Sequence, residues 1–324
     1  ARLATLMMVL TSTALAIALD GNPSSFRIAY PAAAALASLG VIAFSGIRVR
    51  QERQQLAYEA KPTARPTPHG SPNGIYEFDR KDESFSVWAV LKNDPVFRSY
   101  LACQFLAGVS NMMSEPVFVA LVADATEPLG TTNVAGRVVS LEYVVSILLT
   151  MIVPTLLAMI VLPRWGSLLD RLHVVRYRVR HTWFWPLSQI ICFVGGFLVM
   201  HEAGLIWGLA VLGVGRFVLG IAKGGGMIAW MLGHNDFASR RMTSVYMGIH
   251  VTLTGVRGAF APFLGVALYT GWPRIDLVFI AVPRFDGIGP GVFAVSAVLS
   301  LIAWVGFCRL ARRTGPSAQA MDAD

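Results

Sequence analysis

Eight long apolar segments constrain this chain more than any other feature of its sequence. A helix needs about 20 mostly apolar residues to cross the hydrocarbon core of a bilayer. Only 14% of the residues are charged, against about 25% in a typical soluble domain. We therefore predict an all-α integral membrane protein with about eight transmembrane helices. The expected spans are residues 2–19, 27–47, 96–122, 137–162, 182–200, 204–231, 243–270 and 287–308.

Several of these segments contain prolines, among them Pro154, Pro186 and Pro262. They are compatible with membrane helices, because neighbouring helices can satisfy the backbone groups that a proline leaves without a partner.

The positive residues are distributed unevenly between the connections. Nineteen of the 27 Lys and Arg lie in one set, which includes the stretch 48–98 and the loop 163–181, and four lie in the opposite set. Because positive residues are retained on the cytoplasmic side, we expect the first set and both chain ends in the cytoplasm. The expected location is the inner (cytoplasmic) membrane of a bacterium. We expect the basic residues behind the net charge of +8 to interact with the lipid bilayer, and no nucleic-acid partner is expected.

A polar, Pro-rich stretch divides the chain. We expect residues 1–47 to hold two spans, 48–92 to be a cytoplasmic linker, and 93–324 to be a block of six spans. The linker cannot bury a core over 48–83, but "SFSVWAVL" after it is expected to form a short interfacial helix. The chain begins inside an apolar run, so we expect it to be a fragment whose start is missing. Asp94 and Pro95 in "NDPVF" are typical of a helix start.

The loop 163–181 contains the run "GSLLDR", which places Gly166 four residues before Asp170 and Arg171. The glycine allows helix ends to approach closely. The aspartate can accept from the N-terminus of a neighbouring helix, and the basic residues hold the loop on the cytoplasmic face. A basic loop that only sets the topology is the alternative interpretation.

This run resembles the signature loop of the major facilitator superfamily, G-x-x-x-D-R/K-x-G-R/K-R/K, which joins the second and third helices of each six-helix half. His173 stands at the family's second glycine, and the basic residues that follow are displaced. "RFVLGIAKGGG" and "GVRGAFAPFLG" are similar to other helices of the family. The resemblance implies a bundle of the family type covering helices five to twelve, with two helices from the first half and a complete second half. It also implies a gating role for the loop, as a cytoplasmic latch, through Gly166, Asp170 and Arg171.

Ionisable residues inside the apolar spans are expensive to insert and normally face a cavity or a partner. In the six-span block they fall on the first, second, fourth and fifth spans, which the family fold places beside the central cavity. Snorkelling to the cytoplasmic surface is the alternative for Lys223, an interfacial position is the alternative for Glu142, and a hydrogen-bonded packing role is the alternative for His250. The predicted cavity residues are Gln104, Asn111, Glu115, Glu142, Arg216, His250 and Arg257.

Helix rise predicts different depths for these groups. Arg216 and Arg257 are expected near mid-membrane, Glu115 and Glu142 in the outer third, and Lys223 and His250 in the inner third. Direct pairing of the arginines with the carboxylates is therefore not expected without long side chains or a water.

These features predict a secondary transporter of a small solute that works by alternating access, with proton coupling through Glu115 left open. A non-transporting membrane scaffold of the same fold is the alternative; unpaired charges in a cavity favour transport, and closed pairs favour scaffolding. The histidines are scattered, which argues against an enzyme. No cofactor or metal site is indicated, because Cys103, Cys192 and Cys308 are isolated and no phosphate-binding loop occurs.

Overall fold

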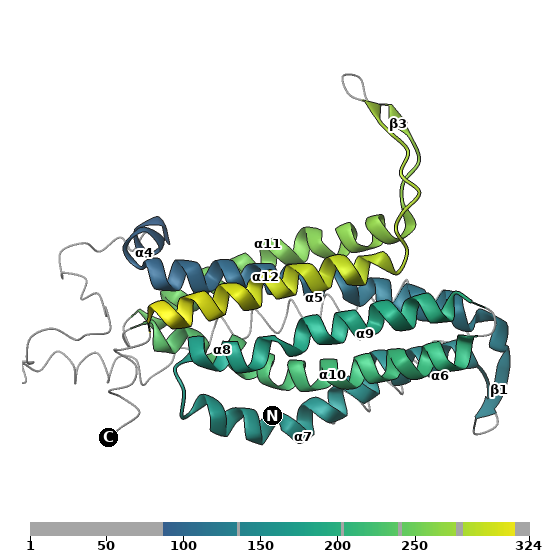
Figure 1. The fold of residues 1–324 in the computed structure, drawn as a ribbon, viewed down its shortest axis with the longest axis horizontal. Helices are drawn as coiled ribbons and strands as arrows, with labels where there is room; N and C mark the ends of the chain where they lie inside the picture. The colour runs from purple at the N-terminus through teal and green to yellow at the C-terminus, as the bar shows by residue number, and fades with distance from the viewer. Residues whose placement is uncertain (1–86, 135–136, 202–203, 239–241, 277–280, 315–324) are drawn as a thin grey trace, which may run out of the picture. The chain divides into compact units, whose positions relative to one another are not determined.

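The computed structural model describes residues 87–134, 137–201, 204–238, 242–276 and 281–314 (Figure 1). The two spans expected at 2–19 and 27–47, and the linker over 48–83, lie outside the described residues and remain predictions. A short helix, α4 (Val87–Asn93), precedes the six-span block, where we expected one.

Six helical segments of the described part are long and apolar enough to cross a membrane, which makes this a multi-pass membrane protein. The first, third and fourth are α5 (Pro95–Thr126), α8 (Val174–Thr182) continued by α9 (Phe184–Val199), and α10 (Leu205–Leu232). The fifth and sixth are α11 (Thr243–Thr270) and α12 (Gly291–Arg313). The start of α5 is as predicted, because Asp94 accepts a 2.8 Å hydrogen bond from the backbone N–H of Phe97.

The second span is interrupted rather than a single α-helix. It consists of α6 (Leu141–Ile147), a π-helical segment (Leu148–Ile152) and α7 (Val153–Leu169). An antiparallel hairpin of β1 (Thr131–Val134) and β2 (Arg137–Ser140) leads into it. The helix that we expected over 137–162 therefore begins at Leu141, four residues later than predicted. A second hairpin, β3 (Ile275–Asp276) and β4 (Ala281–Val282), projects from the same end of the helices (Figure 1).

The prediction of a loop over 163–181 was wrong. α7 continues to Leu169 and α8 begins at Val174, so only a short turn separates the two helices. The charges of α8 concealed an amphipathic helix: Val174, Val175 and Tyr177 are fully buried, while Arg180 of the same helix is exposed.

The helices pack in an order unlike their order in the sequence. α10 packs against α7 and α9, and α5 packs against α11 and α12, while α9 and α12 contact each other. Two clusters of buried apolar side chains result. One is centred on Phe97, Tyr177 and Phe307 near the end where α5 begins, and the other on Phe118, Leu212 and Phe293.

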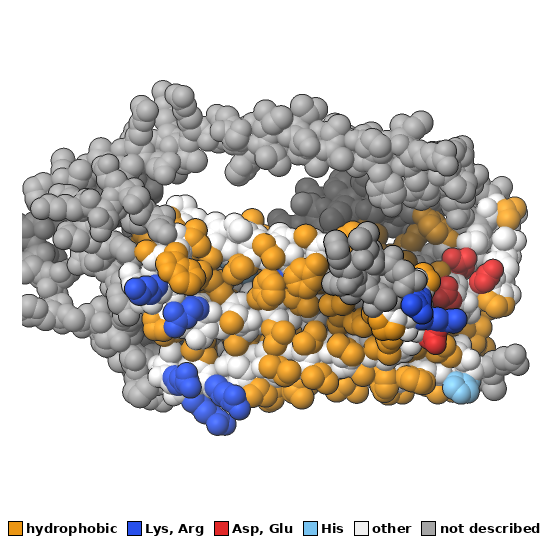
Figure 2. All heavy atoms as spheres, turned by 90° about the horizontal axis from the view of Figure 1, so that it is seen from above, with side chains coloured by type: hydrophobic (Ala, Val, Ile, Leu, Met, Phe, Trp, Pro, Cys, Tyr) orange, Lys and Arg blue, Asp and Glu red, His pale blue; other side chains and the backbone are white. Residues whose placement is uncertain are grey.

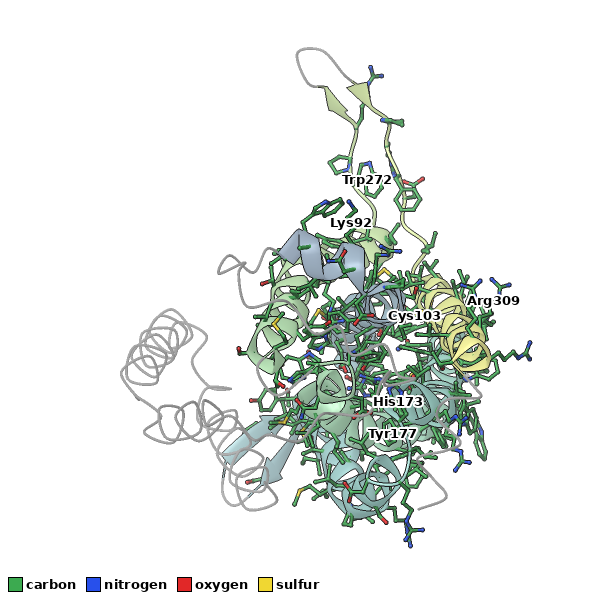
Figure 3. All side chains as sticks on the ribbon, turned by 90° about the vertical axis from the view of Figure 1, so that its left-hand side faces the viewer. Lys92, Cys103, His173, Tyr177, Trp272 and Arg309 are labelled. Atoms are coloured by element: carbon green, nitrogen blue, oxygen red, sulfur yellow. The ribbon has the colours of Figure 1, made fainter. Side chains whose placement is uncertain are left out.

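Apolar side chains cover the middle of the surface and charged ones gather at the ends (Figure 2). One end of the visible face carries Lys and Arg, and the opposite end carries Asp and Glu together with further Lys or Arg. An end-on view shows His173 and Tyr177 near the middle of the bundle and Arg309 at its edge (Figure 3). This distribution suits a protein whose helices lie along the membrane normal.

Candidate functional site

One face of α5 carries a line of polar and small residues through the interior of the bundle. We call these residues the α5 stripe; they are spaced three or four apart, which places them on a single helix face. Cations from three other helices approach the stripe, as described below. The stripe consists of Tyr100, Gln104, Gly108, Asn111 and Glu115.

Glu115 forms ion pairs with two cations from α10. Its Oε2 lies 2.9 Å from Arg216 Nη2, and its Oε1 lies 2.6 Å from Lys223 Nζ. The Arg216 side chain is only 4% exposed, whereas those of Glu115 and Lys223 are 27% and 35% exposed. Because lipid solvates charge poorly, the exposed edge of this pair should face water or protein rather than lipid.

Arg216 is also bound by the irregular segment before α7. Its Nε donates to the carbonyl of Leu149 at 3.0 Å, and its Nη2 donates to the carbonyl of Thr150 at 2.9 Å. These carbonyls lie five and four residues before Pro154, which has no N–H with which to bind either of them. The guanidinium therefore replaces the backbone donor that Pro154 lacks, as we expected of a neighbouring helix.

Two further contacts hold Arg216 in this position. The Phe118 ring lies 4.3 Å from the guanidinium carbon, close enough for a cation–π interaction. Gly220, one turn further along α10, lies against the backbone of Pro154: an added Cβ would approach the Pro154 oxygen to 2.7 Å. A side chain at residue 220 would therefore push α10 away from the carbonyls that Arg216 binds.

The expected separation of Glu115 from its cations was wrong. α5 extends to Thr126, four residues past the expected end, so Glu115 lies eleven residues from the outer end of α5. Arg216 lies eleven residues from the first residue of α10, Leu205, at the same end, so the two depths agree. Lys223 is two turns deeper, but side chains tilt towards the N-terminus of their own helix. Since α5 and α10 run in opposite directions, Glu115 and Lys223 tilt towards each other, and Lys223 does not snorkel.

The other end of the α5 stripe contacts basic side chains that form no ion pair with a carboxylate of the described residues. Arg257 of α11 crosses α5 at Gly108 and donates from Nη1 to the carbonyl of Gln104 at 2.9 Å. Arg178 of α8 donates from Nε to the Tyr100 hydroxyl over 3.4 Å. His250 lies two turns before Arg257 on α11 and within electrostatic range of both arginines. We call Arg178, His250 and Arg257 the inner cation cluster; all three are at least 94% buried.

Several buried polar atoms along the stripe have no hydrogen-bond partner among the described residues. These atoms are two amide oxygens of the stripe and one nitrogen from each member of the inner cation cluster: Gln104 Oε1, Asn111 Oδ1, Arg178 Nη2, His250 Nε2 and Arg257 Nε. Buried polar atoms are normally satisfied, so this pattern indicates a place for a ligand, water or further protein groups. Sequence reasoning missed Arg178 because it assigned 163–181 to a loop; the apolar spacing of α8 was the signal that could have identified it.

The remaining predicted residues lie apart from the stripe. Glu142 is in the first turn of α6, beside the N-cap Ser140, where a carboxylate is favoured by the helix dipole. Asp170 is exposed, and within the described part of the chain it forms no ion pair. The contact that we expected of Asp170 is made by Asp236, whose Oδ2 accepts from the backbone N–H of Val174 at 2.6 Å.

Gly166 lies within the last turns of α7, and Arg171 lies exposed in the turn to α8. In the described ranges, no three His, Cys, Asp or Glu side chains gather as metal ligands would. Comparison with protein-family models, curated proteins and solved structures finds no match for this chain.

Proposed function

We propose that this chain is part of a secondary transporter of the major facilitator type, which moves a small solute by alternating access. The observation that carries the proposal is the α5 stripe: a line of polar groups and buried charges inside a bundle of six apolar helices. Such groups are costly in a membrane and normally mark a path for solutes or ions. Among the described residues, the inner cation cluster has no carboxylate partner, and this supports transport over a scaffold role.

The arrangement suggests how the bundle could change state. The ion pairs of Glu115 join α5 to α10, and the carbonyls at the π-helical segment join α10 to α7. A π-helical segment and a proline are both common where membrane helices bend. A solute that weakens the contacts of Glu115 would release α5 from α10, and protonation of Glu115 would have the same effect. We therefore include proton coupling in the proposal, with Glu115 as the residue that binds and releases the proton.

The proposal extends to placement in the membrane. The end that carries the start of α5, the α7–α8 turn and the end of α12 faces the cytoplasm of a bacterium, with both chain ends on that side. The excess of Lys and Arg at this end supports the orientation.

Proteoliposomes that contain the full-length protein and an internal pH-sensitive dye provide the test. A panel of organic anions, amino acids and sugars is added outside, with and without an imposed pH gradient. Solute-dependent uptake is expected, and Glu115→Gln should remove its response to the gradient. If no solute on the panel enters faster than it enters empty vesicles, and Glu115→Gln changes nothing, the scaffold role becomes the better explanation.

A further inference from the structure

The charges along the α5 stripe do not balance. Arg178, Arg257, Arg216 and Lys223 all approach it, and Glu115 is its only carboxylate. Glu115 is already shared by the two cations of α10. The inner cation cluster therefore lacks a counter-charge within the described part of the chain.

The nearest acids at that end are engaged elsewhere. Asp94 accepts from the N–H of Phe97 and from the Tyr246 hydroxyl, and Asp236 binds the N–H of Val174. The groups that act electrostatically on Arg257 and His250 are other basic side chains, Arg178 and His234 among them, and not a carboxylate of the described residues. Burying arginine without a counter-charge costs several kcal/mol, so a bound anion would stabilise this arrangement.

The two arginines lie within electrostatic range of each other and contact adjacent turns of α5. Arg178 contacts Tyr100 and Arg257 contacts Gln104, and these residues are one turn apart on α5, a rise of about 6 Å. The two guanidinium groups thus reach the same face of α5 from α8 and from α11. Each keeps an unpartnered N–H, Nη2 of Arg178 and Nε of Arg257. Guanidinium groups suit carboxylate and phosphate oxygens, which they bind with paired hydrogen bonds.

We propose that the inner cation cluster binds the negatively charged group, a carboxylate or a phosphate, of the solute that this protein transports. This inference rests on the proposed function and specifies its substrate class as an organic or inorganic anion. Arg178 and Arg257 hold the charge, while Gln104 and His250 line the same site. The ion pairs of Glu115 with Arg216 and Lys223 then form a second site along the same stripe, in which one of the two positive charges is neutralised.

Anion binding can be measured without knowing the solute. The full-length protein is placed in nanodiscs of phosphatidylcholine, and sodium phosphate or sodium acetate is titrated against sodium chloride at equal ionic strength. Because a ligand that binds the folded state stabilises it, at least one of the two anions should raise the melting temperature by several degrees at saturation. Comparing phosphate with acetate shows whether the site prefers a phosphate or a carboxylate group.

Variants assign the effect to the cluster. Arg178→Gln and Arg257→Gln should each weaken anion binding about tenfold or more, as expected for the loss of a charged hydrogen bond. Arg180→Gln, on the exposed face of α8, and Arg312→Gln, exposed at the end of α12, are the matched controls and should bind as the wild type does.

Two milder variants guard against simple loss of folding. Arg257→Lys keeps the charge but loses the planar fork, and should bind with intermediate affinity. Gly108→Ala keeps every charge, but its methyl group would overlap the Arg257 guanidinium and displace it. It should therefore weaken binding although no charged residue is changed.

The outcomes separate this inference from the proposed function. Uptake of neutral solutes only, unchanged in Arg257→Gln, would overturn the anion site and leave the transporter intact. Anion binding with no transport of any solute would instead remove the proposed function. The inference also fails if neither anion exceeds chloride, or if stabilisation appears only in discs that contain phosphatidylglycerol, because the cluster would then bind a lipid headgroup.

Discussion

Arg216 and Lys223 contact the same carboxylate but differ in how deeply each is buried. Replacing Arg216 by Gln leaves Glu115, and the carbonyls of Leu149 and Thr150, short of a donor in the interior. Breaking a buried pair in this way costs about 3–5 kcal/mol. Lys223 is 35% exposed and, within the described part of the chain, its only ion pair is with Glu115, so Lys223→Gln should cost less than about 1 kcal/mol.

Unfolding in detergent, followed by intrinsic fluorescence, measures both variants. Arg164→Gln, at an exposed position of α7, controls for the loss of an arginine as such and should be close to neutral. Equal destabilisation by Arg216→Gln and Lys223→Gln would contradict the structural role that we assign to Arg216.

The sequence identified most residues of the site, but it did not reveal which of them pair. Insertion cost alone selects Glu115, Arg216 and Arg257, because a charge in an apolar run is rare and needs a reason. Pairing depends on where helices end, and the end of α5 is concealed by Asp124 and Glu127, which interrupt the apolar run before and after the last helical residue. An error of four residues in the predicted end of α5 shifts the expected depth of a side chain by about 6 Å. Such a shift is enough for two residues that form an ion pair to be predicted too far apart.

At the scale of the elements, Pro154 gives the Arg216 site its backbone acceptors. Pro154→Ala restores an N–H that can bind the carbonyl of Thr150 or Leu149, so it competes with the guanidinium. The variant should melt at a higher temperature, because a regular helix is favoured by about 3 kcal/mol over one with an interior proline, and it should transport more slowly.

Pro163→Ala in the same helix is the matched control. The carbonyl that it would satisfy, of Met159, accepts from no side chain among the described residues, so only stability should change. Melting temperature and uptake per folded protein are measured for both. Parallel changes in the two variants would show that Pro154 has no special link to the site.

Two glycines of α10 allow a test of the close approach between α10 and α7. A Cβ at Gly220 would meet backbone atoms of Pro154 at 2.7 and 3.0 Å, whereas a Cβ at Gly213 would meet only the Leu149 side chain at an ordinary 3.6 Å. Gly220→Ala should therefore lower stability by about 1–3 kcal/mol. Gly213→Ala should be neutral or stabilising by up to about 1 kcal/mol. Thermal unfolding of the two variants tests this difference. Similar stabilities for Gly220→Ala and Gly213→Ala would contradict the close packing of α10 against α7.

Apolar length predicted the elements better than charge did. Four of the six spans of the block were expected within about five residues of their helices. The second ends seven residues later than expected, at Leu169, and the third begins eight residues earlier than expected, at Val174, because α8 carries three arginines and yet is helical. α8 packs mainly against α12 and α10, with Arg180 on its exposed side and Arg178 buried. Composition averaged over a span does not show which side of a helix each charge occupies.

At the scale of the whole molecule, the excess of Lys and Arg in one set of connections predicts which end faces the cytoplasm. The structure brings the start of α5, the α7–α8 turn and the end of α12 to one end, and both hairpins to the other (Figure 1). The polypeptide could insert in either sense with the same helices. Retention of positive charge on the cytoplasmic side favours one of them.

Cysteine labelling in intact cells tests this orientation. Ser167, exposed near the end of α7, and Asp286, exposed at the base of the second hairpin, lie at opposite ends of the helices. In a variant whose native cysteines are replaced, Ser167→Cys should resist an impermeant thiol reagent applied outside until the membrane is permeabilised, and Asp286→Cys should react at once. The reverse pattern would invert the protein in the membrane and place the inner cation cluster near the outer surface. An anion would then reach the inner cation cluster from outside the cell rather than from the cytoplasm. The labelling result therefore also indicates to which side of the membrane the proposed anion site is nearer.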